Sequence, residues 1–106
     1  MYLGLDLGTS GLRGLLVQED GSIVASAQET YGVNHPHASW SEQDHADWTT
    51  ACESVINSLR ANYIEAFSDL KGIGVSGHMH GATLVDSNGG LLRPCKLWTD
   101  SRAHLE

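Results

Sequence analysis

The feature that most constrains the fold is a glycine-rich bend near the N-terminus, DLGTSGLRG at residues 6–14. It is flanked by YLGLDLG (2–8) and LRGLLVQ (12–18), in which apolar side chains recur with the two-residue period of half-buried strands. So short a connection joins antiparallel neighbours, because a parallel pair needs a long crossover. The chain is therefore expected to begin with a β-hairpin closed by Gly-Thr-Ser-Gly.

Further strands are predicted on both sides of a polar loop. SIVASAQET (22–30) follows a tight turn at Glu19-Asp20-Gly21, and LKGIGVSG (70–77) is expected to form a mostly buried strand. GATLVD (81–86) and LLRPCKLW (91–98) flank a second turn and predict a second hairpin. The order of three strands, a helix, a strand and a hairpin is typical of an α/β domain with a mixed sheet.

The segment after the polar loop predicts an amphipathic helix. Ser41 and Asp44 have the spacing of a capping box, which places the start of the helix near Ser41. Apolar residues then recur at helical spacing: Trp48, Cys52, Val55, Ile56, Leu59 and Tyr63. Trp48 is interpreted as a core residue of this stripe.

Composition limits the partners of the chain. The 106 residues carry a net charge of −7 and no Lys or Arg between Gly14 and Leu59, which argues against a nucleic-acid groove. No apolar run approaches the roughly 20 residues of a membrane span, and the N-terminus does not resemble a signal peptide. Two cysteines, Cys52 and Cys95, are typical of a cytoplasmic protein with reduced thiols.

The glycine bend has the composition of a phosphate site without a lysine. A Walker loop requires Gly-Lys-Ser/Thr, which the chain lacks, but successive backbone N–H groups and hydroxyls can hold an anion by themselves. Arg13 could add a positive charge, and Asp6 could order the waters of a magnesium ion. An ordinary hairpin is the alternative; Asp6 favours function, since strands disfavour aspartate.

These residues carry a resemblance. GLDLGTSGLR resembles the first phosphate motif of the sugar-kinase, Hsp70 and actin superfamily, and HPHASWSEQD (35–44), GHMHGATLVD (77–86) and LRPCKLWTDSR (92–102) are similar to FGGY carbohydrate kinases. The resemblance implies an α/β, ribonuclease H-like (actin-like ATPase) fold. It also implies that residues 1–106 form only part of the N-terminal FGGY domain, with the C-terminal domain absent.

The resemblance also implies roles for individual residues. Asp6 would be important for activity and act on magnesium through water, with no direct metal ligand in the chain. The nucleotide's phosphates would be contacted by Gly8, Thr9, Ser10 and Arg13. The sugar would be contacted by Met79, His80, Trp98 and Asp100. His78 stands where the family usually has glutamine, and its side chain is expected to face away from that of His80.

The implied reaction is phosphorylation of D-xylulose to D-xylulose 5-phosphate by ATP and Mg²⁺, in a cytoplasmic enzyme that forms a homodimer. The family's general-base aspartate and adenosine pocket would lie outside these residues, so the chain alone is expected to be inactive. A sheet lacking its remaining elements should also leave apolar surface uncovered.

The sequence is also compatible with four other interpretations. Another FGGY kinase, acting on ribulose, gluconate or glycerol, remains open, as does an actin-like nucleotide-binding module that is not a kinase. Gly72, Gly74 and Gly77 match a dinucleotide fingerprint as letters, but they lead into a strand rather than a helix. The pairs His35-x-His37 and His78-x-His80 would need additional ligands to hold a metal.

Overall fold

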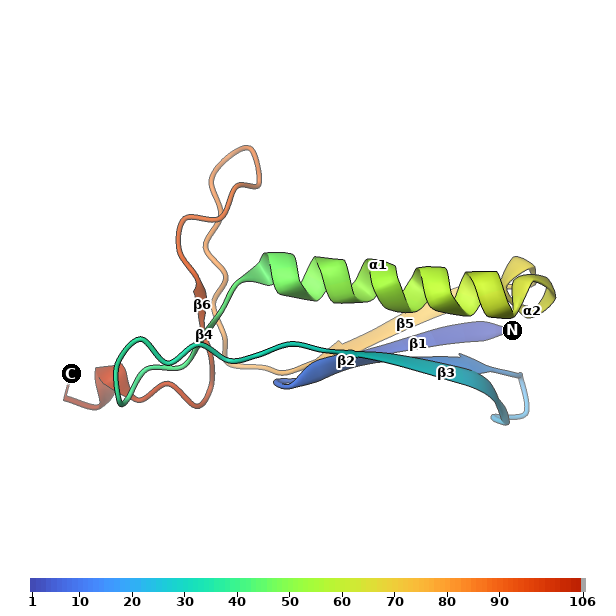
Figure 1. The fold of residues 1–106 in the computed structure, drawn as a ribbon, viewed down its shortest axis with the longest axis horizontal. Coiled ribbons are helices and arrows are strands. Elements are labelled where there is room, and N and C mark those ends of the chain that lie inside the picture. Colours follow the sequence, from blue (N-terminus) through green and yellow to red (C-terminus); the bar gives the residue numbers. More distant parts are fainter. Residues whose placement is uncertain (106) are drawn as a thin grey trace.

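The computed structural model describes residues 1–105 and is built on a four-stranded mixed sheet of order β3-β2-β1-β5 (Figure 1). The strands are β1 (Tyr2–Leu7), β2 (Gly11–Val17), β3 (Ile23–Thr30) and β5 (Gly72–Gly77). β1 and β3 pair antiparallel with β2, whereas β5 pairs parallel with β1. The expected hairpins at the N-terminus and the α/β class are confirmed.

The helix begins three residues later than the capping-box spacing suggested. α1 spans His45–Asn62, and its N-cap is Asp44, whose side chain accepts a hydrogen bond from the backbone N–H of Ala46. Such a cap contributes about 1 kcal/mol. The prediction that the helix starts near Ser41 was wrong. Ser41 is buried ahead of the helix, and its backbone N–H donates a hydrogen bond to the carboxylate of Asp100. A short helix, α2 (Ile64–Ser68), was not predicted.

One face of the sheet packs against α1, along β2 and β3. The side chains of Leu3, Leu16, Val55 and Leu59 are almost completely buried between the two layers. The close approach depends on Gly14, where an added Cβ would lie 2.5 Å from Cγ1 of Val55. Val55 and Leu59 confirm the centre of the predicted apolar stripe, but its two ends were wrong. Trp48 is half-buried outside the core cluster, and Tyr63 is the C-cap of the helix and is exposed.

The prediction that β5 is mostly buried was wrong. β5 is an edge strand, and α1 packs against β2 and β3, on the other side of β1. Ile73 and Val75 are therefore 60% and 74% exposed, although they pair with the buried Leu3 and Leu5 of β1. The expectation that apolar surface stays uncovered in this chain is confirmed.

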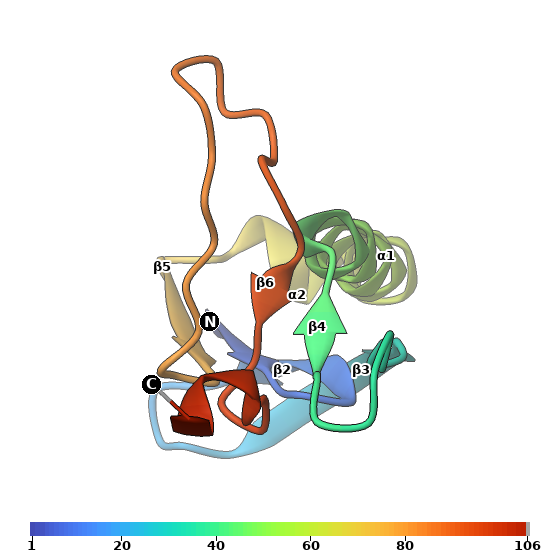
Figure 2. The same ribbon diagram turned by 90° about the vertical axis from the view of Figure 1, so that its left-hand side faces the viewer.

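A second small sheet lies beyond the N-terminal end of α1. It pairs β4 (Glu42–Gln43) with β6 (Cys95–Lys96), and Figure 2 shows the two strands side by side. The predicted second hairpin survives only as isolated bridges, Ala82 with Lys96 and Val85 with Leu91, in an arm that projects from the body. A 3-10 turn, η1 (Arg102–Leu105), follows.

The molecule is elongated. Its extents are 52 × 29 × 18 Å and its radius of gyration is 16.2 Å, whereas a compact domain of this length has about 13 Å. No helix within residues 1–105 is long and apolar enough to cross a membrane.

Candidate phosphate- and sugar-binding site

The glycine bend forms the tight turn between β1 and β2. The N–H of Gly8 donates to the carbonyl of Gly11 at 2.9 Å. An added Cβ at Gly11 would lie 2.5 Å from the backbone oxygen of Glu29, so only glycine fits without displacing β3. Within residues 1–105 the backbone N–H groups of Thr9 and Ser10 have no acceptor, and they are available to an anion.

An open depression of about 370 Å³ adjoins this turn on the sheet face opposite α1. Asp6, Gly8, Ser10 and Arg13 all line it. The structure therefore brings together four of the five residues assigned to the nucleotide's phosphates and magnesium. A carboxylate, a hydroxyl and a guanidinium around one hollow can bind a phosphate and an associated cation together.

Two neighbours orient the charged groups of the depression. Asp6 and Arg13 are directly paired across β1 and β2. The hydroxyl of Ser76 donates to Oδ1 of Asp6 at 2.9 Å, and the guanidinium of Arg13 donates to the amide oxygen of Gln28 at 3.2 Å. Ser76 and Gln28 were missed from the sequence because they lie on β5 and β3, whose register was unknown.

Tyr31 holds the turn from the side of β3. Its hydroxyl donates to the carbonyl of Gly8, and its backbone N–H donates to the carbonyl of Ser10 at 3.1 Å. Burial, and then the negative charge of Asp6, raise the pKa of Tyr31 above its usual value. The phenol therefore stays a donor at neutral pH.

Gln43 of β4 and Trp48 of α1 form a chain of hydrogen bonds that ends on the turn. Gln43 is fully buried, and its amide nitrogen donates to the carbonyls of Thr9, at 2.6 Å, and Gly32, at 3.2 Å. The indole N–H of Trp48 donates to the amide oxygen of Gln43 at 2.9 Å. In a single sequence nothing distinguishes this glutamine from an exposed one, although it lies within the stretch HPHASWSEQD that carried the resemblance.

Three of the four residues assigned to the sugar are exposed. Met79 and Trp98 are 68% and 59% exposed, and His80 is exposed with a positive φ of 66°. The left-handed conformation is uncommon for a residue other than glycine and is often found at functional sites. The indole N–H of Trp98 donates to the hydroxyl of Thr9 at 3.2 Å. This bond joins residues 79–100, which carry all four assigned residues and are called the sugar segment below, to the turn.

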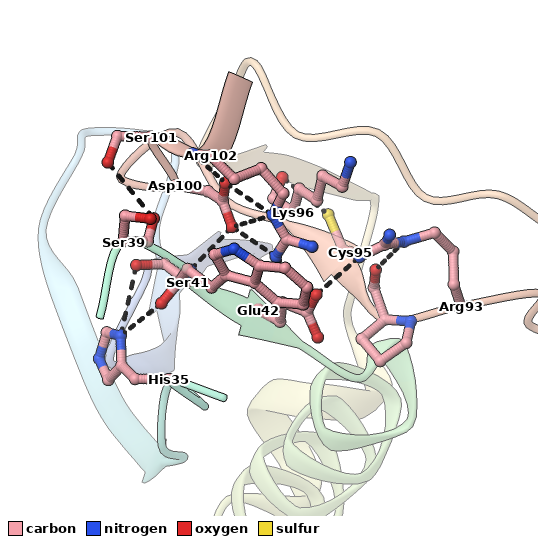
Figure 3. Close-up of polar contacts among 12 residues, drawn as sticks. His35, Ser39, Ser41, Glu42, Arg93, Cys95, Lys96, Asp100, Ser101 and Arg102 are labelled. Carbon is pink, nitrogen blue, oxygen red and sulfur yellow. Dashed lines mark hydrogen bonds and ion pairs between the residues drawn. The ribbon is translucent and has the colours of Figure 1, made fainter. Parts of the chain in front are cut away.

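Asp100 is placed differently from the other three. Its side chain is 4% exposed, and the guanidinium of Arg102 donates hydrogen bonds to both of its carboxylate oxygens at 2.6–3.0 Å. Oδ2 also accepts the N–H of Ser41 at 2.8 Å (Figure 3). The hydrogen bonds from Arg102 hold the pKa of Asp100 far below its usual range. In this structure Asp100 is an internal anion, and a sugar hydroxyl would have to share its oxygens with Arg102.

Glu42 extends the same network into β4. Its Oε1 accepts hydrogen bonds from Arg102 at 2.6 Å and from Arg93 at 2.7 Å, and Figure 3 shows the two arginines converging on it. Arg102, with Arg93 in addition, lowers the pKa of Glu42. The guanidinium of Arg102 also lies 3.7 Å from the centre of the Trp40 ring. The network fixes the segment that carries Trp98.

His78 points toward α1 rather than toward the sugar segment. Its ring lies 5.2 Å from the ring of Trp48, edge to face, whereas His80 is exposed. No group of three or more His, Cys, Asp or Glu able to hold a metal occurs within residues 1–105.

The mixed sheet with its N-terminal hairpins and flanking helix is the fold of the N-terminal part of a sugar-kinase domain of the actin-like class. Residues 1–106 match the FGGY family of carbohydrate kinases, N-terminal domain, and the chain belongs to this family.

Relatives and solved structures agree with this assignment. The chain is 45% identical over 102 residues to the xylulose kinase of Klebsiella pneumoniae, covering 96% of this chain and 21% of that protein. It is 42% identical over 106 residues to the xylulose kinase of Escherichia coli K12, covering 100% of this chain and 22% of that protein. A crystal structure described as a xyloylose kinase from Brucella ovis has a TM-score of 0.95 and 51% identity, covering 98% of this chain and 22% of that chain. The chain thus spans about a fifth of the length of the curated relatives it matches.

Proposed function

We propose that this chain supplies the phosphate-binding turn and one wall of the sugar site of a kinase that phosphorylates D-xylulose to D-xylulose 5-phosphate with ATP. The observation that carries the proposal is the grouping of Asp6, Ser10 and Arg13 around one depression, beside a turn in which the N–H groups of Thr9 and Ser10 have no acceptor among residues 1–105. The 42–45% identity to two xylulose kinases supports the choice of sugar.

The residues of the depression fit a magnesium–nucleotide complex, which supplies the phosphoryl group and neutralises its charge. The N–H groups of Thr9 and Ser10 and the guanidinium of Arg13 would hold the phosphate oxygens. Asp6 would orient the magnesium ion through its waters. Trp98 would lie against the C–H face of the sugar while His80 bonds its hydroxyls.

The general base and the adenosine pocket belong, in this proposal, to residues outside the 106 of this chain, and the working enzyme is a homodimer. The chain alone is therefore expected to leave sugar unphosphorylated. Phosphorylation by the isolated 106-residue chain would contradict this part of the proposal.

Other sugars are the main competing proposal, because glycerol kinase of Acinetobacter baylyi is also 31% identical over 103 residues. The test is a panel of xylulose, ribulose, gluconate and glycerol, scored by kcat/KM in the full-length polypeptide that contains this chain. D-Xylulose is expected to give the largest value. A larger value for another member would reassign the substrate, and no turnover with any sugar would favour an actin-like nucleotide-binding module.

A further inference from the structure

Gln43 joins three parts of the chain at one buried point. It lies on β4, and its side chain contacts the turn between β1 and β2, the segment after β3, and α1. It has no exposed surface. A fully buried polar side chain is costly unless all of its groups find partners, and here each of them does.

The chemistry of the three partners requires an amide. Thr9 and Gly32 present carbonyl oxygens, which need a donor, whereas Trp48 presents an indole N–H, which needs an acceptor. Only a side chain with a donor on one atom and an acceptor on the other satisfies all three. The opposite amide orientation would set oxygen against two carbonyls, so the partners fix the orientation.

The contact with Thr9 is the one that concerns the phosphate site. Thr9 is held at its carbonyl by Gln43 and at its hydroxyl by Trp98. Its peptide unit carries the N–H of Ser10, since that N–H and the carbonyl of Thr9 belong to the same planar amide. Fixing the carbonyl therefore fixes the direction in which the N–H of Ser10 points.

We propose that Gln43 is a positioning residue that sets the orientation of the Thr9–Ser10 peptide, so that the N–H of Ser10 faces the phosphates of the nucleotide. This inference rests on the proposed function for the identity of the anion. Gln43 does not itself touch substrate. Among the described residues its side chain contacts neither Met79 nor His80. It is linked to Trp98 only through Thr9, whose carbonyl it binds while Trp98 binds the hydroxyl, so the larger effect is expected on the nucleotide.

The test is Gln43→Glu in the full-length polypeptide. Glutamate keeps the length of glutamine and an acceptor for Trp48 but cannot supply both donors, because it has no N–H when ionised and a single O–H when protonated. We expect kcat/KM for ATP to fall by up to about 100-fold, the loss that a misplacement of roughly 1 Å can cause. The KM for the sugar is expected to stay unchanged. A variant that was merely less stable would lose active enzyme without this split between the two substrates.

Two further variants distinguish a specific effect of Gln43 from a general loss of folded protein. Trp48→Phe removes the donor to the amide oxygen of Gln43 and leaves its donation to Thr9 intact, so a smaller loss in the same direction is expected. Ser54→Ala removes a hydrogen bond of similar length, 2.8 Å to Glu29, on the α1 side of the sheet. Its kinetic constants are expected to match those of the unmodified enzyme.

Binding of Mg-ADP, measured by calorimetry without sugar, separates this inference from the proposed function. Weaker binding in Gln43→Glu supports the inference even if D-xylulose is not the substrate. Unchanged binding and an unchanged KM for ATP in folded Gln43→Glu would overturn it. A protein that binds no nucleotide at all would overturn both the inference and the proposed function.

Discussion

The glycine turn and the sugar segment meet at Thr9, but they are held in place very differently. The turn is fixed by Tyr31 and Gln43, which donate to consecutive backbone carbonyls. Met79 and His80 project into solvent from a stretch with no regular strand pairing of its own. Binding groups held by packed neighbours are preorganised, whereas exposed ones become ordered only when something binds or covers them.

The turn and the sugar segment differ in how much of their support comes from residues of this chain. The backbone carbonyls of the turn are bound by Tyr31 and Gln43, which lie 23 and 34 residues further along the chain than their partners. In the sugar segment, Asp100 is bound by Arg102, whereas Met79 and His80, which follow the exposed edge strand β5, are exposed. The contacts that orient the turn therefore lie within this chain, and we expect Met79 and His80 to become ordered only when a ligand or further protein covers them.

Asp6→Ala tests the phosphate half with the largest expected effect. Removing the carboxylate that would orient the magnesium ion should lower kcat by at least about 100-fold, the usual loss for one preorganised electrostatic contact. Steady-state kinetics of the full-length polypeptide measure it. Ser76→Ala, which removes only the hydroxyl that donates to Asp6, serves as the matched control with a smaller loss. Near-normal turnover of Asp6→Ala would show that the depression is not the phosphate site.

Trp98→Ala tests the sugar half. Loss of the ring against the sugar should raise the KM for D-xylulose about tenfold. Trp98→Phe separates the two roles of this side chain, because it keeps an aromatic ring and loses the hydrogen bond to Thr9. It should retain the KM for sugar and weaken nucleotide binding about threefold, the effect of one hydrogen bond. If Trp98→Ala alters only the KM for ATP, Trp98 belongs to the phosphate half alone.

The smallest effect expected is a dependence of stability on acid through Asp100 and Glu42. Their pKa values are lowered in the folded protein, so the stabilisation is complete above the unfolded values of about 4 and is lost as the pH falls below them. Urea midpoints of the full-length polypeptide should therefore decrease from pH 5 to pH 3. Arg102→Met should flatten that decrease; Lys71→Met, which breaks only the exposed pair with Glu19, should not.

Much of the fold follows from local pattern. The first hairpin, the turn at Gly21 and the apolar stripe of α1 depend on spacing and turn chemistry, which one sequence displays. The exposure of β5 could not be predicted, because an apolar strand looks the same whether or not it is covered. Gln43 was missed because its partners, Thr9 and Gly32, lie far from it in sequence.

The resemblance assigned Asp6 and Asp100 to one binding site, whereas the structure places these two carboxylates in different surroundings. Asp6 and Arg13 share one depression, as expected for the phosphate site. Asp100 is instead bound internally by Arg102, a pairing two residues apart that the motif LWTDSR already contained. Its contact with the sugar remains a prediction.

The most direct test of phosphate binding by the turn between β1 and β2 is a crystal structure of the full-length polypeptide with magnesium, D-xylulose and a non-hydrolysable ATP analogue. Phosphate oxygens are expected within about 2.7–3.2 Å of the N–H groups of Thr9 and Ser10, the range of ordinary hydrogen bonds. A bound analogue whose phosphates lie away from the turn between β1 and β2 would contradict the account.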